Sequence, residues 1–400
     1  GELNQGDEDA FVIKLDSNGN EIWTKLFGTP YSDIPWFSKI DENGNLYLGG
    51  ETAGNLNGES NNGVIDINGV NQDSEDAFLI KIDPQGNELW TKLFGSSHGE
   101  ESHDVAFSKD GFTYLVGETY KDSSLNDTHV FNNQLVSGDQ NAFVIKLDSD
   151  GNEIWTKLFG QQNWTSANSI EIDDNDNLLI VGDTSDNLNG ELNDGGEDGF
   201  IIKLNSDGNE IWTKLFGTTS RDWVSGVKLD NQGDLFISGS TSGNLNGETN
   251  NGNDDGFIIK LDSDGNEIWT KLFGSQFRDE NHRLVLGNNG DIFVTGYSDD
   301  SNTSSSVAYI YKVNESGDQQ TGGHNYGQPT GGQQQGGQQS GQPIVGFVNG
   351  IEYTGDFHTM PDGTKMTGAS HGAGTDEIIY DTLHESMQGD RGTGSPGHGG

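Results

Sequence analysis

The sequence contains no cysteine, which excludes disulfide bonds and thiol chemistry. It has no run of about 18 apolar residues, the length that a membrane-spanning helix needs, so we expect no membrane insertion. Positively charged side chains are scarce, because 20 Lys and Arg stand against 64 Asp and Glu, for a formal net charge of −44. A chain this acidic repels phosphate backbones, so we expect no nucleic-acid partner.

Repetition dominates what the sequence does contain. The phrase FVIKLDSNGNEIWTKLFG and its near-copies occupy residues 11–28, 78–95, 143–160, 200–217 and 257–274, with a shortened copy at 309–314. Such self-similarity is typical of one supersecondary unit stacked on copies of itself. Residues 1–4 match residues 190–193, so we expect the chain to begin inside a repeat, with upstream sequence removed or not included.

Each repeat predicts four short antiparallel strands. In the last full copy, strand a (257–261) and strand b (267–273) form a hairpin, and strand c (224–229) and strand d (234–239) form another before it. The copies are spaced 67, 65, 57 and 57 residues apart, and no segment has the 3.6-residue period of a helix. Four such strands repeated around a circle indicate an all-β fold, a β-propeller.

Several details of the propeller can be predicted from the same pattern. We expect the a strands to line the central axis and the repeated Trp of the outermost b strands to pack between blades. We assign the extra length of the longer periods to the b-to-c loops, which share one face with the d-to-a loops. The blade number is five with one strand to spare, or six or seven if upstream sequence completes the ring.

The pattern Asp-Gly-Asn-Leu-Tyr-Leu-x-Gly, followed by Asp-Ala-Phe-Val-Ile-Lys-Leu-Asp-x-x-Gly-Asn-x-x-Trp, resembles the bacterial SBBP-type β-propeller repeat. It is also similar to NHL-type blades in strand order. The resemblance covers about residues 1–318 and implies a propeller over 1–316.

The composition changes after the propeller. Residues 317–343 are rich in Gly and Gln and predict a flexible linker, 344–384 predict a small β module, and 385–400 a flexible tail. The module carries Tyr353, Gly355, His358, Pro361, Met366, Gly368 and His371, and this spacing resembles a module of tailed-phage virion proteins, cyanophages especially. It departs from that pattern at Met360, where a His is expected, which weakens a His-cluster metal site. The resemblance implies that other virion or surface-assembly proteins bind the module.

Candidate ligand-binding residues are those that depart from the repeat on the loop face. They are Tyr31, Trp36, Trp164, Arg221, Trp223 and Arg278. Exposed aromatic side chains on variable loops suit stacking against a host surface polysaccharide or contact with a host protein. The alternative is that these residues only cover blade edges. Because the chain is so acidic, a neutral glycan is the favoured ligand.

Candidate metal ligands lie in two oxygen-rich turns. They are Asp148, Asp150 and Asn152, and Asp262, Asp264 and Asn266. Carboxylate and amide oxygens beside a Gly are what Ca²⁺ takes as ligands. The alternative is a structural turn of the Asp-box kind, in which the Asp holds the backbone. The acid-rich segment 251–255 offers a second calcium site.

The Asp-box likeness also raises a glycosidase of the sialidase type, which needs an Arg cluster and a Tyr/Glu pair. We assign Arg221, Arg278 and Arg283 to d-to-a segments, but only two adjacent connections carry them. No Tyr/Glu pair stands out and no Ser/His/Asp arrangement is recognisable, so we expect no enzyme. The favoured interpretation is a structural or adhesion protein of a phage virion, associated with the tail or a fibre. The alternative is a secreted bacterial adhesin or scaffold at the cell surface.

Overall fold

The computed structural model describes residues 3–63, 75–121, 128–287, 290–300 and 305–317, together with short strands between residues 324 and 379. The chain divides into two compact units, Gly1–Gln328 and Pro329–Gly400. The second unit contains β25 (Gly346–Val348) paired with β26 (Ile351–Tyr353), and β27 (Phe357–Thr359), β28 (Lys365–Thr367) and β29 (Ile378–Ile379) in one sheet. Most of the predicted linker, tail and phage-like motif lies outside the described residues, so the domain boundaries stay a prediction.

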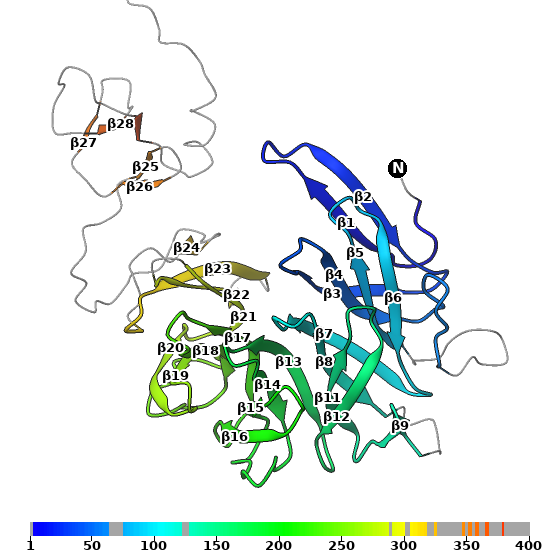
Figure 1. Ribbon diagram of the computed structural model, residues 1–400. Helices are drawn as coiled ribbons and strands as arrows, with labels where there is room; N and C mark the ends of the chain where they lie inside the picture. Colours follow the sequence, from blue (N-terminus) through cyan, green and yellow to red (C-terminus); the bar gives the residue numbers. More distant parts are fainter. Residues whose placement is uncertain are drawn as a thin grey trace, which may run out of the picture. The chain divides into compact units, whose positions relative to one another are not determined.

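The first unit is an all-β propeller of five four-stranded antiparallel sheets, as the sequence predicts (Figure 1). Blade 1 is β3 (Asp33–Ile40), β4 (Leu46–Thr52), β5 (Asp76–Ile82) and β6 (Glu88–Phe94); blade 2 is β7 (Gly99–Phe107), β8 (Thr113–Tyr120), β11 (Gln140–Leu147) and β12 (Glu153–Phe159); blade 3 is β13 (Thr165–Ile172), β14 (Leu178–Thr184), β15 (Asp198–Leu204) and β16 (Glu210–Phe216); blade 4 is β17 (Asp222–Leu229), β18 (Leu235–Thr241), β19 (Asp255–Leu261) and β20 (Glu267–Phe273); blade 5 is β21 (Asp279–Leu286), β22 (Ile292–Asp300), β23 (Ser305–Val313) and β24 (His324–Asn325).

Two small hairpins complete the described strands of this unit. β1 (Ala10–Leu15) pairs only with β2 (Glu21–Phe27), and β9 (Val130–Phe131) pairs with β10 (Gln134–Leu135) in the connection between β8 and β11. In the described part of the chain no helix is long and apolar enough to cross a membrane.

The c strands, not the a strands, lie at the axis, so this part of the prediction is wrong. Side chains of the first strands meet across the centre: the Lys39 ammonium of β3 reaches the Ile170 carbonyl of β13 at 3.4 Å. Each a strand is third in its sheet, between strands d and b. The reason is burial: all seven residues of β15 are buried, as suits a strand covered on both faces, whereas the axial strands mix buried residues with half-buried or exposed ones.

The long variable segments also connect different strands from those we expected. Residues 53–75 join β4 to β5, and residues 121–139 join β8 to β11, so the extra length lies between strands d and a. Because neighbouring strands are antiparallel, the d-to-a and b-to-c connections still share one face of the propeller.

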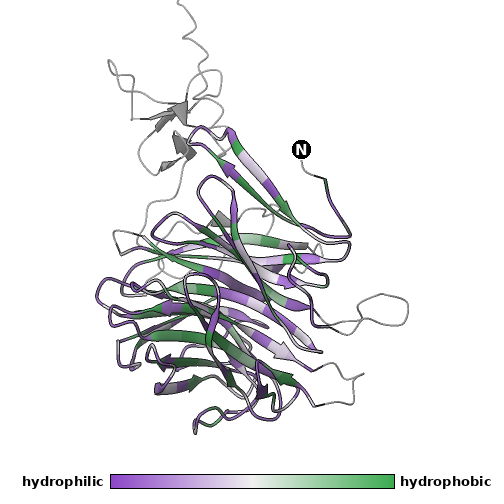
Figure 2. Ribbon diagram, turned by 45° about the vertical axis from the view of Figure 1, so that its right-hand side comes forward, coloured by the Kyte–Doolittle hydropathy of each residue, from purple (hydrophilic) through white to green (hydrophobic). Residues whose placement is uncertain are grey.

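The repeated Trp packs between blades, as expected. Trp90 of blade 1 donates its indole N–H to the Ser149 carbonyl of blade 2 at 3.2 Å, and its ring covers Gly151 in the same turn. Trp23, Trp155, Trp212 and Trp269 cover the matching glycine of the next hairpin. The hydrophobic stretches along the stacked sheets form the core between the blades (Figure 2).

Candidate functional site: an axial funnel lined by five β-bulges

Every axial strand contains a β-bulge at the same place. Pairing with the second strand slips by one residue there in all five blades. The five skipped residues are Trp36, His103, Asn168, Ser225 and His282. A bulge leaves one residue unpaired and can re-aim its side chain. All five line one hollow at the axis, and we call them the bulge ring.

A repeated glycine makes the bulge sterically feasible. A Cβ atom on Gly182 of β14 would lie 1.9 Å from the Ser166 carbonyl oxygen, two residues before the bulge. Gly50, Gly117, Gly239 and Gly296 face the corresponding carbonyl at 1.9–2.0 Å. No side chain fits at such a distance, so the glycine near the end of each d strand is required by the bulge beside it.

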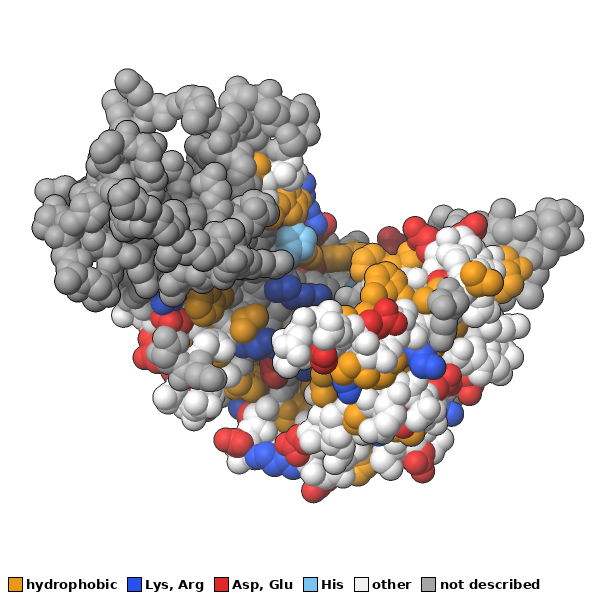
Figure 3. Space-filling view, turned by 90° about the horizontal axis from the view of Figure 1, so that it is seen from above, with side chains coloured by type: hydrophobic (Ala, Val, Ile, Leu, Met, Phe, Trp, Pro, Cys, Tyr) orange, Lys and Arg blue, Asp and Glu red, His pale blue; other side chains and the backbone are white. Residues whose placement is uncertain are grey.

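The bulge ring, with Glu101, Trp223 and Arg283, encloses a hollow of about 520 Å³, which we call the axial funnel. Trp36 is 48% exposed, and the Trp223 ring meets the His282 ring edge-on at a centroid distance of 5.7 Å. Figure 3 shows Lys or Arg and His side chains beside hydrophobic ones at the hollow near the centre of the view. Aromatic faces and polar groups therefore share one concave surface.

One side of the funnel holds a compact group of ionisable side chains. His103 lies 3.6 Å from the Glu101 carboxylate and its Nδ1 lies 3.1 Å from the Ala167 carbonyl. Burial alone would lower the pKa of His103, but Glu101 and Glu118 outweigh it and raise the pKa. Burial raises the pKa of Glu51 to about 8, with the Glu101 charge adding to the effect. Ligand atoms of Glu101, His103 and Glu118 lie within 4.8 Å of one another, so these three could approach a metal, although their mutual contacts already account for the cluster.

A second layer of charges lies deeper along the axis. Lys39 lies 3.6 Å from the Asp104 carboxylate and 3.7 Å from that of Glu171, and Lys228 also pairs with Glu171. The four residues come from blades 1 to 4, and their charges balance. This layer links the axial strands below the funnel, and Arg283 lines the same region as a further cation.

The structure brings two of the predicted ligand-binding residues together and separates the others. Trp36 and Trp223 both line the axial funnel. Trp164, Arg221 and Arg278 instead occupy one equivalent position, directly before an axial strand. Tyr31 lies in the connection before β3 and is not among the residues that line the funnel.

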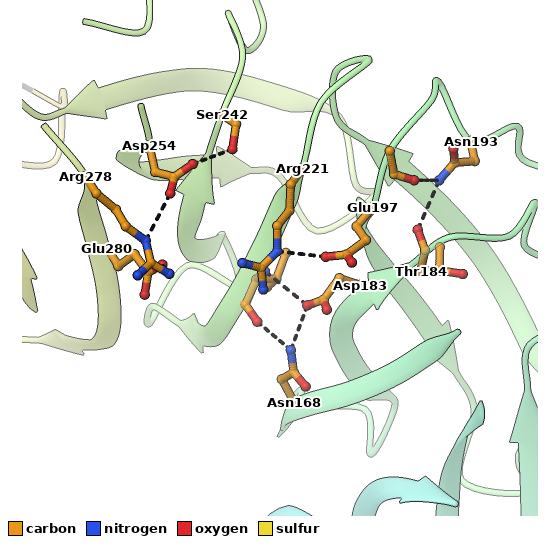
Figure 4. A network of polar contacts seen from close by, with 12 residues as sticks. Asn168, Asp183, Thr184, Asn193, Glu197, Arg221, Ser242, Asp254, Arg278 and Glu280 are labelled. Carbon is orange, nitrogen blue, oxygen red and sulfur yellow. Dashed lines mark hydrogen bonds and ion pairs between the residues drawn. The ribbon is translucent and has the colours of Figure 1, made fainter. Parts of the chain in front are cut away.

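Both arginines form ion pairs across a blade junction, which explains their departure from the repeat. The Arg221 Nε donates to Glu197 at 2.8 Å, and the Arg278 Nε donates to Asp254 at 3.1 Å. Arg278 also pairs with Glu280 (Figure 4). In the same region Asn168 donates to the Asp183 carboxylate at 2.7 Å, which fixes the amide of one bulge residue (Figure 4).

The predicted calcium turns are closed by their own hydrogen bonds. The Asp148 carboxylate accepts the backbone N–H groups of Asp150 and Asn152 at 2.9 and 2.8 Å and the Asn152 amide at 3.0 Å. Asp262, Asp264 and Asn266 repeat this arrangement. Asn205 forms the same turn without a carboxylate, so the turn itself requires an acceptor rather than a metal. Calcium at these two turns stays a prediction.

Most residues of the funnel are not among those predicted from the sequence. His103, Asn168, Ser225, His282 and Arg283 were not among the predicted site residues, yet all line it. A signal did exist: each bulge residue stands three positions after a buried Asp, Glu or Thr at or near the start of its axial strand, and four different residue types occupy this position in the five blades. Finding it required aligning the c strands instead of the more conspicuous a–b hairpins.

Comparison with known proteins agrees with the fold. The beta-propeller repeat family, SBBP, matches residues 22–57 and 211–246. Each match runs from strand b through the next axial hairpin, and so spans a blade junction.

Two curated relatives match parts of the chain. Regulatory protein FlaEY of Caulobacter vibrioides is 27% identical over 186 residues, which cover 44% of this chain and 19% of that protein. An uncharacterized WD repeat-containing protein of Acanthamoeba polyphaga mimivirus is 25% identical over 237 residues, covering 49% of this chain and 16% of that protein. The matched region thus spans less than one fifth of either relative.

Solved structures resemble the chain only distantly. An apocarotenoid oxygenase from Synechocystis has a TM-score of 0.41 at 12% identity, covering 75% of this chain and 64% of that one. The tail fiber of a Staphylococcus aureus phage has a TM-score of 0.20 at 9% identity, covering 74% and 93%. At these values the likenesses carry no argument about function.

Proposed function

We propose that this chain is a non-enzymatic binding protein of a tailed-phage particle, whose propeller attaches to carbohydrate on the host surface through the axial funnel. The observation that supports the binding role is that Trp36 of blade 1 and Trp223 of blade 4 line the same concave surface. Indole rings stack on the apolar faces of sugars, and the neighbouring amide, hydroxyl and imidazole groups can bond sugar hydroxyls.

A neutral glycan fits this surface better than an acidic one. The chain has a net charge of −44, and the cations at the base of the funnel are already paired with Asp104 and Glu171. An acidic polysaccharide would meet general repulsion, which the one lining arginine, Arg283, offsets only in part. Binding through stacking and neutral hydrogen bonds avoids this repulsion.

The contacts in the funnel favour binding over catalysis. Ser225 bonds the Ser238 carbonyl and hydroxyl of the neighbouring strand, at 3.1 Å each, rather than a histidine. His103 pairs with Glu101 and contacts the Ala167 carbonyl, which orients it within the wall. A hydrolase would need a nucleophile and base aimed at one point in the hollow, and neither residue offers that arrangement.

The assignment to a particle rests on the resemblance of residues 353–371 to a virion module. A second candidate is a bacterial surface adhesin with the same propeller, which the partial match to a Caulobacter protein favours. Mass spectrometry of purified phage particles should detect the chain if the first assignment holds. Detection in host culture grown without phage would overturn the particle role and leave the adhesin.

The binding role is tested by calorimetry with neutral oligosaccharides prepared from the host envelope. Changing Trp36 and Trp223 together to Ala should weaken binding by roughly tenfold or more, since loss of about 1.4 kcal/mol already has that effect. Trp164→Ala is the matched control, because this Trp lies at the rim outside the funnel lining. Loss of binding in the control but not in the funnel variant would move the site to the rim.

A further inference from the structure

Acidic residues meet in pairs at three blade junctions and at the junction of the β1–β2 hairpin with blade 1. In each pair, the first residue lies at the beginning of a strand a or directly before it. The second residue lies within the first two positions of the axial strand of the next sheet. The pairs are Asp9 with Asp33, Asp76 with Glu100, Asp198 with Asp222, and Asp255 with Asp279. A backbone hydrogen bond holds each pair together: the Asp222 N–H donates to the Glu197 carbonyl at 2.7 Å, and Asp279 N–H donates to the Asp254 carbonyl at 2.7 Å. Standard backbone dimensions then place the paired Cα atoms within about 7 Å.

The two pairs of blades 3 to 5 are almost completely buried. One oxygen of each carboxylate is used by its own loop: Asp222 Oδ2 accepts the Thr218 backbone N–H at 2.6 Å and its hydroxyl at 2.9 Å. Asp198 Oδ2 accepts the Asp194 N–H at 2.7 Å. Ser275 and Asn251 hold Asp279 and Asp255 in the same way.

The other oxygen of the first acid is left without a partner. Oδ1 of Asp198 and of Asp255 is buried and accepts no hydrogen bond, and the same atom is unpartnered in Asp9 and Asp76. Burial raises the pKa of Asp198 to about 6, and the charge of Asp222 adds to the effect. Arg221 lies nearby but pairs with Glu197. A recurrent buried acceptor without a donor requires an explanation, of which a bound ion is one.

A fifth junction shows that the fold does not need these acids. Between blades 2 and 3 the equivalent positions hold Asn141 and Thr165, and the Thr165 hydroxyl bonds that of Thr184 at 2.8 Å. The same blade-to-blade packing forms there with two neutral side chains. The carboxylates at the other junctions are therefore additions to the architecture.

We propose that the junctions Asp198/Asp222 and Asp255/Asp279 each bind one divalent cation, Ca²⁺, through their buried carboxylates. A hard cation takes carboxylate oxygens as ligands, satisfies the unpartnered Oδ1 and removes the repulsion within the pair. The proposal does not include the junction Asp76/Glu100, because an imidazole lies beside its carboxylates: His129 Nε2 is 3.5 Å from the Glu100 carboxylate. These cation sites lie at blade junctions and do not depend on glycan binding in the funnel.

The test uses the full chain, freed of metal with EDTA and titrated with CaCl₂ by calorimetry and equilibrium dialysis. We expect at least two Ca²⁺ per chain, and one fewer when Asp198 and Asp222 are both changed to Asn. Asp174→Asn removes an exposed carboxylate that belongs to neither the junctions nor the two predicted calcium turns. It is the matched control, expected to leave the count unchanged. A wild-type chain that binds no Ca²⁺, or a count that the Asp174 variant lowers and the junction variant does not, would overturn the proposal.

Melting temperatures separate a cation site from a purely structural pair. Saturating Ca²⁺ should raise the melting temperature of the wild-type chain by roughly 5 °C or more, and less in the junction variant. In EDTA the junction variant should melt at or above the wild-type temperature, because its paired charges are gone. If the variant is equally destabilised in EDTA and in Ca²⁺, the carboxylates act as loop acceptors alone and no cation is involved.

Discussion

The bulge ring depends on a glycine that the repeat carries in every d strand, and changing that glycine should distort the funnel. A Cβ atom on Gly239 would lie 2.0 Å from the Trp223 carbonyl oxygen, whereas such carbon–oxygen contacts are normally about 3.3 Å or longer. Gly239→Ala therefore requires a movement of more than about 1 Å between β17 and β18. In a packed sheet, forced shifts of this kind cost about 3 kcal/mol.

Gly226 provides a matched control in the same blade. It lies one residue after the bulge at Ser225, and a Cβ atom there would meet only the Ser238 hydroxyl, at 3.8 Å. Gly226→Ala should be neutral or stabilise by about 0.5 kcal/mol, because it restricts the unfolded chain without a clash. Equilibrium urea unfolding of the two variants measures the difference. If both variants have the same free energy of unfolding, the glycine is not required by the bulge, and the account of how the funnel forms is wrong.

Three further predictions concern the groups around the funnel and the junctions. The pKa of Glu51 is raised to about 8 in the folded chain, so between pH 5 and 8 the folded chain holds a proton that the unfolded chain has released. This group should therefore lower the stability of the fold as pH rises from 5 to 8. Glu51→Gln should flatten the plot of melting temperature against pH, and an unchanged slope would contradict the raised pKa. Trp155→Ala should lower the free energy of unfolding by about 3 kcal/mol. This is the lower end of the range for removing a large aromatic side chain, because the ring is half-buried. A change near zero would refute its packing role between blades. Arg221→Ala should cost at most about 1 kcal/mol, since its pair with Glu197 is partly exposed, and should leave glycan affinity unaltered; weaker glycan binding would show that this Arg contacts the ligand after all.

The sequence was sufficient for the fold because the repeat encodes contacts that every blade shares. Strand b carries the Trp, and the next hairpin carries the Gly that the Trp covers, so both partners recur in the phrase itself. The prediction that the a strands line the axis is wrong for a physical reason, because a near-continuous apolar strand needs cover on both of its faces. In this propeller such a strand is buried inside its sheet, and the polar c strand faces the axial hollow.

The site was harder to predict because it depends on pairing register. The bulge at Asn168 appears only when β13 is aligned with β14, and its sequence signal emerges only when the axial strands of all the blades are compared. The ion pairs of Arg221 and Arg278 also join residues 24 positions apart, which meet because one blade ends where the next begins. The length of the repeat does not reveal how far apart in the sequence two residues must be in order to contact each other across a junction.

The two residues of every acidic pair at the junctions are also 24 positions apart. This constant spacing determines which substitutions the repeats can accept without disturbing a junction. A junction contact involves two repeats at once, so a change at one side, such as Thr165 in place of an acid, is matched by Asn141 at the other. A bulge residue has no pairing partner in its sheet, so Trp36 and Ser225 can occupy equivalent positions without a compensating change elsewhere. Selection for a ligand can therefore act on the bulge ring one residue at a time, whereas the junctions must change in pairs. If the proposed binding role holds, that difference puts ligand specificity at the axis and stability, with the proposed cations, between the blades.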